Sequence, residues 1–179
     1  MILLNGPPSC GKSTLARRYV QEHPLSLNLD VDRIRDLIGG WLDQPHAAGL
    51  LARAVALAAA RTHLQAGHDV VIPQFLARAE FVEQLDQLAG EVGADFHEIV
   101  LLDSKDEVLR RFAERTRIAA DPAHVQVHQL LQRHGGVAAL SAMYDRLLDL
   151  IATRPAAKVI HSADGVAEQT YQRMLSQLT

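Results

Sequence analysis

Short apolar stretches alternate with longer amphipathic stretches along the whole chain, which is the pattern of strands followed by helices. Residues 69–73 are short and apolar enough to form a strand buried in a parallel sheet. Residues 25–32 alternate apolar and polar side chains and predict another strand. Together with residues 2–4, 96–102 and 157–161, the pattern predicts five strands.

The stretches between these strands predict helices, because their apolar positions recur at helical spacing and glycine or proline residues bound them. The expected helices lie at residues 15–20, 33–38, 47–66, 78–91, 103–117, 127–134, 137–152 and 165–178. Strands that alternate with helices pair in parallel through right-handed crossovers, with helices on both faces of the sheet. The sequence therefore predicts an α/β fold of three layers, formed by one domain over residues 1–179.

Composition narrows the class of protein. With 48% hydrophobic residues and 22% charged residues, the chain is typical of an ordered globular protein. The net charge of −3 offers no broad attraction to nucleic acid or to an anionic membrane, and it disfavours nucleic acid as a partner without excluding it. Cys10, the single cysteine, precludes an intramolecular disulfide. No apolar run reaches the length of a bilayer span and no signal peptide is recognisable, so we expect a cytoplasmic protein.

Residues 6–14 carry the most specific chemistry in the chain. Their sequence fits G-x-x-x-x-G-K-[ST], and it lies between an apolar strand and a helix, the context that this phosphate-binding motif requires. In such a loop, backbone N–H groups and the start of the helix face a phosphate chain, the lysine reaches the terminal phosphates and the hydroxyl binds Mg²⁺. Lys12 and Ser13 take these two roles. The predicted nucleotide-binding residues are Gly6, Ser9, Cys10, Gly11, Lys12, Ser13 and Thr14.

A second group of polar residues follows the second predicted strand. Ligands of open α/β sheets bind at the carboxyl ends of the strands, so Asp30, Asp32 and Arg35 are expected near the phosphate loop. Asp32 is the candidate base for an acceptor hydroxyl, and Asp30 the candidate for a water-mediated Mg²⁺ contact. Arg35, one helical turn beyond Asp32, is expected to bind substrate or the transferring phosphoryl group. The alternative is structural: Asp32 caps a helix and the arginines are solvated.

These residues resemble P-loop kinases of the nucleoside-monophosphate-kinase superfamily, a group that includes polynucleotide kinases, chloramphenicol phosphotransferase, zeta-type toxins and shikimate kinase. The D-x-x-R spacing from Asp32 to Arg35 is similar to polynucleotide kinase, and the D-x-D spacing from Asp30 to Asp32 is similar to shikimate kinase. Both similarities imply that Asp32 is the base. The resemblance also implies the strand order 2-3-1-4-5 and a mobile helical lid, and it identifies no substrate.

The arginine-rich stretch after the fourth strand is the candidate lid. Arg111, Arg115 and Arg117 are expected to approach the phosphates and offset transition-state charge, with Arg115 as the first choice. The alternative is a solvated basic face paired with acidic neighbours on the same helix. No acidic residue follows the third strand, where many P-loop enzymes hold the metal shell. Gln74 at that position is a candidate substrate-binding residue, whereas Asp103 after the fourth strand joins the metal shell or caps a helix.

The sequence thus predicts a phosphotransferase that uses ATP and Mg²⁺ and transfers the γ-phosphate to a hydroxyl of a small molecule, either a metabolite or an antibiotic. Residues 37–48 and 111–136 are expected to shape the acceptor pocket and the lid. A nucleic-acid 5′-hydroxyl is the alternative acceptor. A nucleotide-binding regulator or resistance protein with only slow hydrolysis is the alternative from another functional class. The preference between ATP and GTP stays open, as does the choice between a monomer and a homodimer.

Overall fold

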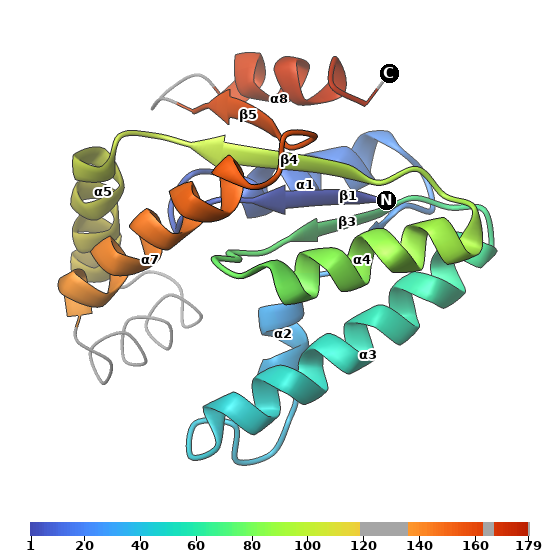
Figure 1. Ribbon diagram of the computed structural model, residues 1–179, viewed down its shortest axis with the longest axis horizontal. Coiled ribbons are helices and arrows are strands. Elements are labelled where there is room, and N and C mark those ends of the chain that lie inside the picture. Colours follow the sequence, from blue (N-terminus) through green and yellow to red (C-terminus); the bar gives the residue numbers. More distant parts are fainter. Residues whose placement is uncertain (119–135, 163–166, 179) are drawn as a thin grey trace.

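The structure, a computed structural model, describes residues 1–118, 136–162 and 167–178 (Figure 1). The described residues contain a sheet of five parallel strands in the order β2-β3-β1-β4-β5. The strands are β1 (Ile2–Asn5), β2 (Leu27–Asn28), β3 (Val70–Pro73), β4 (His97–Leu102) and β5 (Lys158–His161). The predicted fold class and strand order are therefore confirmed.

Helices cover both faces of the sheet (Figure 1). They are α1 (Lys12–Glu22), α2 (Val31–Asp36), α3 (Pro45–Gln65), α4 (Ala79–Val92), α5 (Lys105–Ile118), α7 (Gly136–Ala152) and α8 (Ala167–Leu175). A hydrophobic core lies on each face of the sheet, and successive residues of β1 contribute to one core and then the other, because successive side chains of a strand point to opposite faces. Leu3 packs with residues of α3 and α4, and Leu4 packs with residues of α1 and α8. The expected helix at residues 127–134 lies outside the described residues.

The second predicted strand is the main correction. It was expected over residues 25–32, but β2 spans only Leu27–Asn28 and helix α2 already begins at Val31. Asp30 ends the extended segment because its carboxylate accepts a hydrogen bond from the Asp32 N–H at 3.0 Å, as a helix N-cap does. Val31 is buried, but as the first residue of α2 and not as part of a strand. The alternative reading of Asp32 as the cap is also wrong, since the cap is Asp30.

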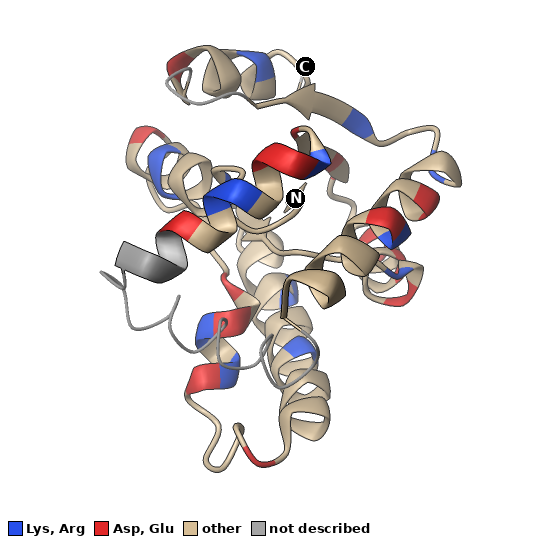
Figure 2. Cartoon of the chain, turned by 90° about the vertical axis from the view of Figure 1, so that its left-hand side faces the viewer, with Lys and Arg blue, Asp and Glu red and all other residues tan. Residues whose placement is uncertain are grey.

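All carboxyl ends of the strands lie at one edge of the sheet because the strands are parallel. This edge faces the viewer in Figure 2, where α5 and α2 beside it carry both basic and acidic residues. The segment between β1 and α1 crosses the same edge (Figure 1). Among the described residues, no helix combines the length and the apolar character that crossing a bilayer requires. The fold thus brings the two predicted groups of polar residues to a common edge.

Candidate active site

The loop between β1 and α1 has a backbone that glycine makes possible. Gly6 has φ +141°, and a Cβ there would overlap the carbonyl oxygen of Leu101 and lie 3.0 Å from the Cys10 sulfur. Ser9 at φ 68° and Gly11 at φ 93° are also left-handed, and Gly11 is the N-cap of α1. Left-handed residues interspersed in a tight turn direct successive N–H groups to one side, which forms an anion-binding concavity. The predicted phosphate loop therefore has the backbone that its chemistry needs.

Lys12 is held by its own loop. Its ammonium group donates hydrogen bonds to the carbonyl oxygens of Gly6 and Pro7, both at 2.8 Å, and lies 3.8 Å from the Cys10 sulfur. Ser13 and Thr14 are exposed in the first turn of α1, and that turn carries no acidic side chain. The lysine and the two hydroxyls thus surround one helix N-terminus, whose partial positive charge favours anions.

Asn5 is a functional candidate that the sequence analysis missed. It is completely buried, and its amide oxygen accepts hydrogen bonds from the N–H of Gly6 at 2.7 Å and of Leu76 at 2.9 Å. Its amide NH₂ donates to the carbonyl of Leu76 at 3.0 Å. The side chain therefore joins the start of the phosphate loop to the segment after β3. A polar residue at the carboxyl end of a buried strand is the only sequence signal that could have found it.

The two carboxylates after β2 have different environments. Asp30 is half-buried, and burial raises the pKa of its carboxyl group, with the nearby charge of Asp32 adding to the effect. Asp32 is more open, with 43% of its side chain exposed, and it accepts a hydrogen bond from Arg35 at 2.8 Å. Asp32 therefore faces solvent at the carboxyl edge while Asp30 supports the local backbone as a cap.

Arg35 is fixed on three sides. Besides Asp32, it contacts Asp36 at 3.5 Å, and its guanidinium lies 4.4 Å from the ring centroid of Trp41, which is buried. Its Nε is buried without a hydrogen-bond partner among the residues that the structure describes. Arg35 therefore lies beside Asp32, and its Nε is still available for a further contact.

Gln74 follows β3 at the same edge of the sheet. Its backbone N–H donates to the carbonyl of Leu4 at 3.0 Å, which places the residue beside the end of β1. Its side-chain oxygen is buried and has no hydrogen-bond partner within the described part of the chain. Because buried polar atoms normally find partners, this oxygen is a candidate for contact with a ligand.

The candidate lid arginines are only partly described. Arg111 pairs with Asp103 and with Glu107, the latter at 2.9 Å, and only 11% of its side chain is exposed. Asp103 is thus engaged by an arginine, and it does not cap α5, because Ser104 accepts the hydrogen bond from the Glu107 N–H. Arg115 and Arg117 lie on the last turns of α5. The lid segment at residues 119–135 lies outside the described residues.

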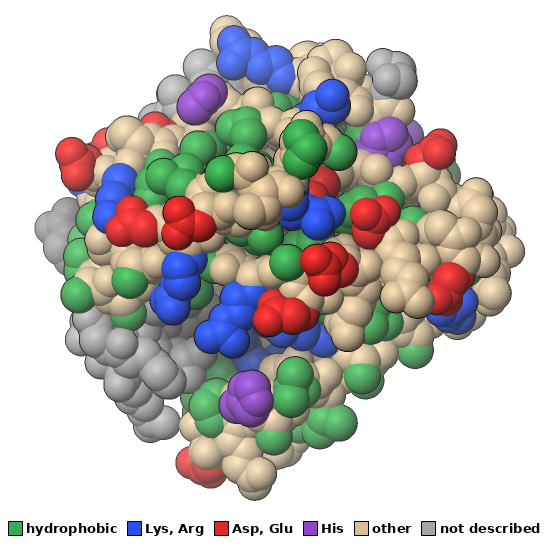
Figure 3. Space-filling model, viewed as in Figure 1, with side chains coloured by type: hydrophobic (Ala, Val, Ile, Leu, Met, Phe, Trp, Pro, Cys, Tyr) green, Lys and Arg blue, Asp and Glu red, His purple; other side chains and the backbone are tan. Residues whose placement is uncertain are grey.

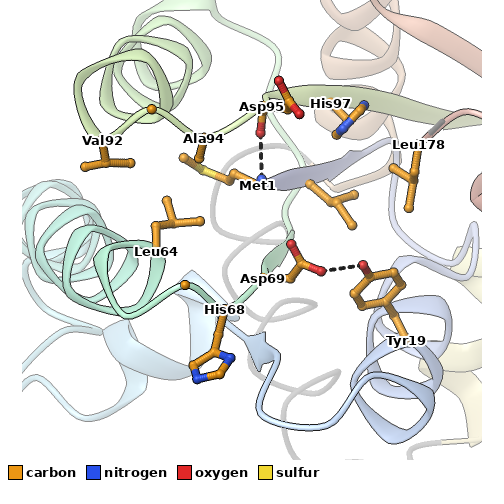
Figure 4. A pocket seen from close by; sticks show the side chains of 13 residues that line it. Met1, Tyr19, Leu64, His68, Asp69, Val92, Ala94, Asp95, His97 and Leu178 are labelled. Carbon is orange, nitrogen blue, oxygen red and sulfur yellow. Dashed lines mark hydrogen bonds between the residues drawn. The ribbon is translucent and has the colours of Figure 1, made fainter.

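A pocket of about 440 Å³ lies away from this site, at the amino ends of β1, β3 and β4 (Figure 4). The amino group of Met1 donates to the carbonyl of Asp95 at 2.7 Å, and the hydroxyl of Tyr19 donates to Asp69 at 2.8 Å. Met1, Asp69 and Asp95 precede β1, β3 and β4, whereas the phosphate loop follows β1. The pocket therefore belongs to the opposite edge of the sheet and contributes nothing to the candidate active site.

Comparison with known proteins agrees with the fold. The model of the AAA domain family matches residues 1–140. A tunicamycin resistance protein from Deinococcus radiodurans is 17% identical with a TM-score of 0.60, covering 99% of this chain and 94% of its own. A shikimate kinase from Bacteroides thetaiotaomicron is 19% identical with a TM-score of 0.61, covering 99% and 97%.

A kinase candidate from Chloroflexus aurantiacus is 17% identical with a TM-score of 0.68, covering 99% of this chain and 98% of its own. No curated protein matches the chain. At these identities the solved structures bear on the fold alone, and that fold is the one predicted from the resemblance to P-loop kinases.

Proposed function

The chain belongs to the AAA domain family, and we propose that it transfers the γ-phosphate of ATP to a hydroxyl group of a small metabolite or antibiotic. One observation carries this proposal. The loop that begins at Gly6 and the pair formed by Asp32 and Arg35 lie at the same edge of a parallel sheet. A phosphate-binding loop beside an exposed carboxylate offers the two parts that phosphoryl transfer to a hydroxyl needs.

The loop fits a nucleoside triphosphate. Gly6 lets the loop pass close to the Leu101 carbonyl, where a Cβ would overlap, and the left-handed residues Ser9 and Gly11 turn N–H groups toward an anion. Cys10 supplies a small side chain within the loop, and Thr14 adds a second hydroxyl to the helix start. Lys12 would exchange its two carbonyl partners for the β- and γ-phosphates.

Mg²⁺ would be held by the hydroxyl of Ser13 and, through water, by the carboxylate of Asp30. Both are oxygen donors of the kind that this hard cation prefers. When bound, the ion supplies positive charge that offsets the charge developing on the phosphates. Burial makes ionisation of Asp30 unfavourable in the metal-free protein, and a cation at this position would favour the ionised carboxylate.

The reaction is a displacement at phosphorus. The acceptor oxygen forms a bond to the γ-phosphorus, the bond from that phosphorus to the β,γ-bridging oxygen breaks, and ADP leaves. Asp32 accepts the proton of the acceptor hydroxyl, and its open carboxylate is suited to this because it is reached from the edge of the sheet. Lys12 and an arginine of the lid, with Arg115 as first choice and Arg111 and Arg117 as alternatives, stabilise the transferring group.

Two unpartnered buried atoms support an acceptor site beside Asp32. The Nε of Arg35 is a donor and the side-chain oxygen of Gln74 is an acceptor, and both lack partners in the described residues. A polar acceptor molecule would satisfy them, which gives both residues the role of orienting its reactive hydroxyl.

A second function is favoured by a single contact. Arg35 binds Asp32 at 2.8 Å, and an aspartate that serves mainly as the partner of an arginine is not a base. In that case the chain binds a nucleotide, hydrolyses it slowly and transfers nothing to a second substrate.

The experiment that separates these functions is the transfer of ³²P from γ-labelled ATP or GTP to a panel of hydroxyl compounds in the presence of Mg²⁺. The panel contains nucleosides, sugars, aminoglycosides and 5′-hydroxyl oligonucleotides. Tunicamycin and shikimate are added because two structural neighbours are a tunicamycin resistance protein and a shikimate kinase. A labelled acceptor supports the kinase and identifies its substrate class, whereas label only in free phosphate supports slow hydrolysis.

Asp32→Asn should lower transfer by about 10²-fold or more while leaving nucleotide affinity nearly unchanged, because it removes only the base. Asp36→Asn is the matched control, since Asp36 lies on the same helix and also contacts Arg35. Equal activity of these two variants would contradict the assignment of Asp32 as the base.

A further inference from the structure

Helix α3 exposes a row of large apolar side chains on the surface of the protein. Leu50, Leu51 and Val55 are 53%, 57% and 52% exposed. The opposite face of the same helix is formed by four alanines that are fully or almost fully buried in the core, Ala48, Ala52, Ala56 and Ala60. The helix forms one edge of the molecule, and hydrophobic side chains lie along that edge (Figures 1 and 3). We call Leu50, Leu51, Ala54, Val55 and Ala58 the α3 stripe.

The α3 stripe carries no charge. Arg53 is the only lysine, arginine or acidic residue between Pro45 and Ala60, and its guanidinium lies 5.3 Å from the ring centroid of Phe81 on α4, away from the stripe. An exposed helix of a soluble protein normally presents charged side chains to water. An uncharged row of leucine and valine over two turns therefore indicates a surface that another apolar surface covers.

Along residues 43–61, the charged residues other than Arg53 lie beyond the two ends of the stripe, and they have opposite signs. Asp43 is exposed just before the helix, and Arg61 lies near its last turn, where 43% of its side chain is exposed. Asp43 precedes the first residue of α3, and Arg61 follows the last residue of the stripe, so one charge flanks each end. A two-fold axis perpendicular to the helix exchanges these two ends.

We propose that the α3 stripe is the contact surface of a homodimer in which the α3 helices of two copies pack antiparallel. A two-fold axis perpendicular to α3 at the middle of the stripe places the stripe of one copy on the stripe of the other. The same axis brings the Asp43 end of each stripe to the Arg61 end of the other, whereas a parallel arrangement would bring like charges together. Antiparallel packing also sets the two helix dipoles against each other favourably. Ala54 and Ala58 allow the helices to approach closely.

The test measures the mass of the protein in solution by sedimentation velocity from about 1 to about 200 µM, a range that covers interfaces of modest affinity. We expect the wild-type chain to reach twice the mass of a single chain. Leu51→Glu and Val55→Glu should each raise the dissociation constant by at least about tenfold, because each buries a carboxylate in an apolar contact. Leu148→Glu is the matched control, since Leu148 is an exposed leucine of α7 and lies outside the stripe. Its dissociation constant should stay unchanged.

Charge exchange tests the antiparallel arrangement separately. Asp43→Lys and Arg61→Glu should each weaken the dimer, and the double variant should restore it, because the opposite signs meet again. Thermal unfolding of every variant confirms that the chain still folds. Arg61 also pairs with Glu91 of its own chain, so rescue by the double variant, and not the single effect, identifies the contact between copies.

Three results would overturn the proposal. A single-chain mass at about 200 µM would do so directly, and so would a dimer that Leu51→Glu leaves intact. A monomer in which Leu51→Glu speeds hydrogen exchange at residues 119–135 would show that this segment of the same chain covers the stripe. The test does not depend on catalysis, because the Lys12→Ala variant should dimerise like the wild type.

Discussion

Replacing Asn5 by alanine is expected to destabilise the protein and weaken nucleotide binding together. The side chain makes three buried hydrogen bonds, with the Gly6 N–H at 2.7 Å and with the N–H and carbonyl of Leu76 at 2.9 and 3.0 Å. Alanine removes all three and leaves the backbone partners buried. It also releases the start of the phosphate loop from the segment after β3.

The size of the effect follows from the number of bonds. A buried hydrogen bond contributes about 1 kcal/mol, and leaving its partner unsatisfied costs 1–3 kcal/mol, so we expect a loss of at least about 3 kcal/mol. For a chain of this length, about 3 kcal/mol corresponds to a fall of roughly 6–12 °C in the melting temperature. This is a large fraction of the ~5–15 kcal/mol that holds a typical domain folded.

The assay is equilibrium unfolding in urea, followed by circular dichroism, with nucleotide affinity measured on a fluorescent ATP analogue. Asn28→Ala is the control, because Asn28 ends the neighbouring strand β2 and its amide oxygen has no partner among the described residues. That variant should lose less than about 1 kcal/mol. If Asn5→Ala and Asn28→Ala lose equal stability, or if Asn5→Ala keeps wild-type affinity for the nucleotide, the proposed positioning role of Asn5 is wrong.

Three further predictions concern the same edge of the sheet and helix α5. Gly6→Ala should lower the melting temperature and nucleotide affinity, because strained φ values cost ~1–3 kcal/mol and the new Cβ overlaps the Leu101 carbonyl. Gly67→Ala is the milder control, because Gly67 has φ +84° but open space around the position of a Cβ. Asp30→Asn should unfold in urea no more easily than wild type at pH 7, because asparagine also caps helices. In addition, the raised pKa of Asp30 means that the stabilising contribution of this carboxyl group is lost as pH rises, so little remains at pH 7 for the substitution to remove. Unchanged Mg²⁺ dependence of transfer in this variant would count against the metal role. Two arginines of α5 lower the pKa of Glu107 to about 2, so its contribution to stability should disappear as pH falls from about 4.5 toward 2, and acid titration of Glu107→Gln should show a smaller loss.

The sequence predicted the fold well because two independent signals agreed. Apolar runs between helical stretches indicated parallel strands, and the motif at residues 6–14 fixed the loop that joins β1 to α1. The second strand was predicted too long, because residues 25–32 alternate in a way that a short strand followed by a capped helix also satisfies. Val31 is apolar in either case, and only the hydrogen bond to Asp30 decides between them.

Candidate site residues could be proposed from the sequence where a motif carries the chemistry, and they were missed where the role depends on packing. Gly6 and Lys12 belong to a spaced pattern, whereas Asn5 is a single polar residue whose role depends on the buried Leu76 backbone, 71 positions away. The pairing of Arg111 with Asp103 likewise joins residues on either side of a helix start, which spacing alone does not reveal. Both contacts depend on how the chain folds, and the spacing of residues along the sequence does not reveal them.

We expect the contacts of Lys12 with the carbonyls of Gly6 and Pro7 to make the proposed phosphate loop selective among anions. A phosphate that binds there replaces these two oxygens as the hydrogen-bond acceptor of the ammonium. The net free energy of binding is therefore the difference between two sets of charge-assisted hydrogen bonds. A lone orthophosphate only replaces the two hydrogen bonds that it takes from the Lys12 ammonium, so it gains little binding free energy. A triphosphate extends along the backbone N–H groups as well, and therefore outcompetes the commonest small anion for the same loop.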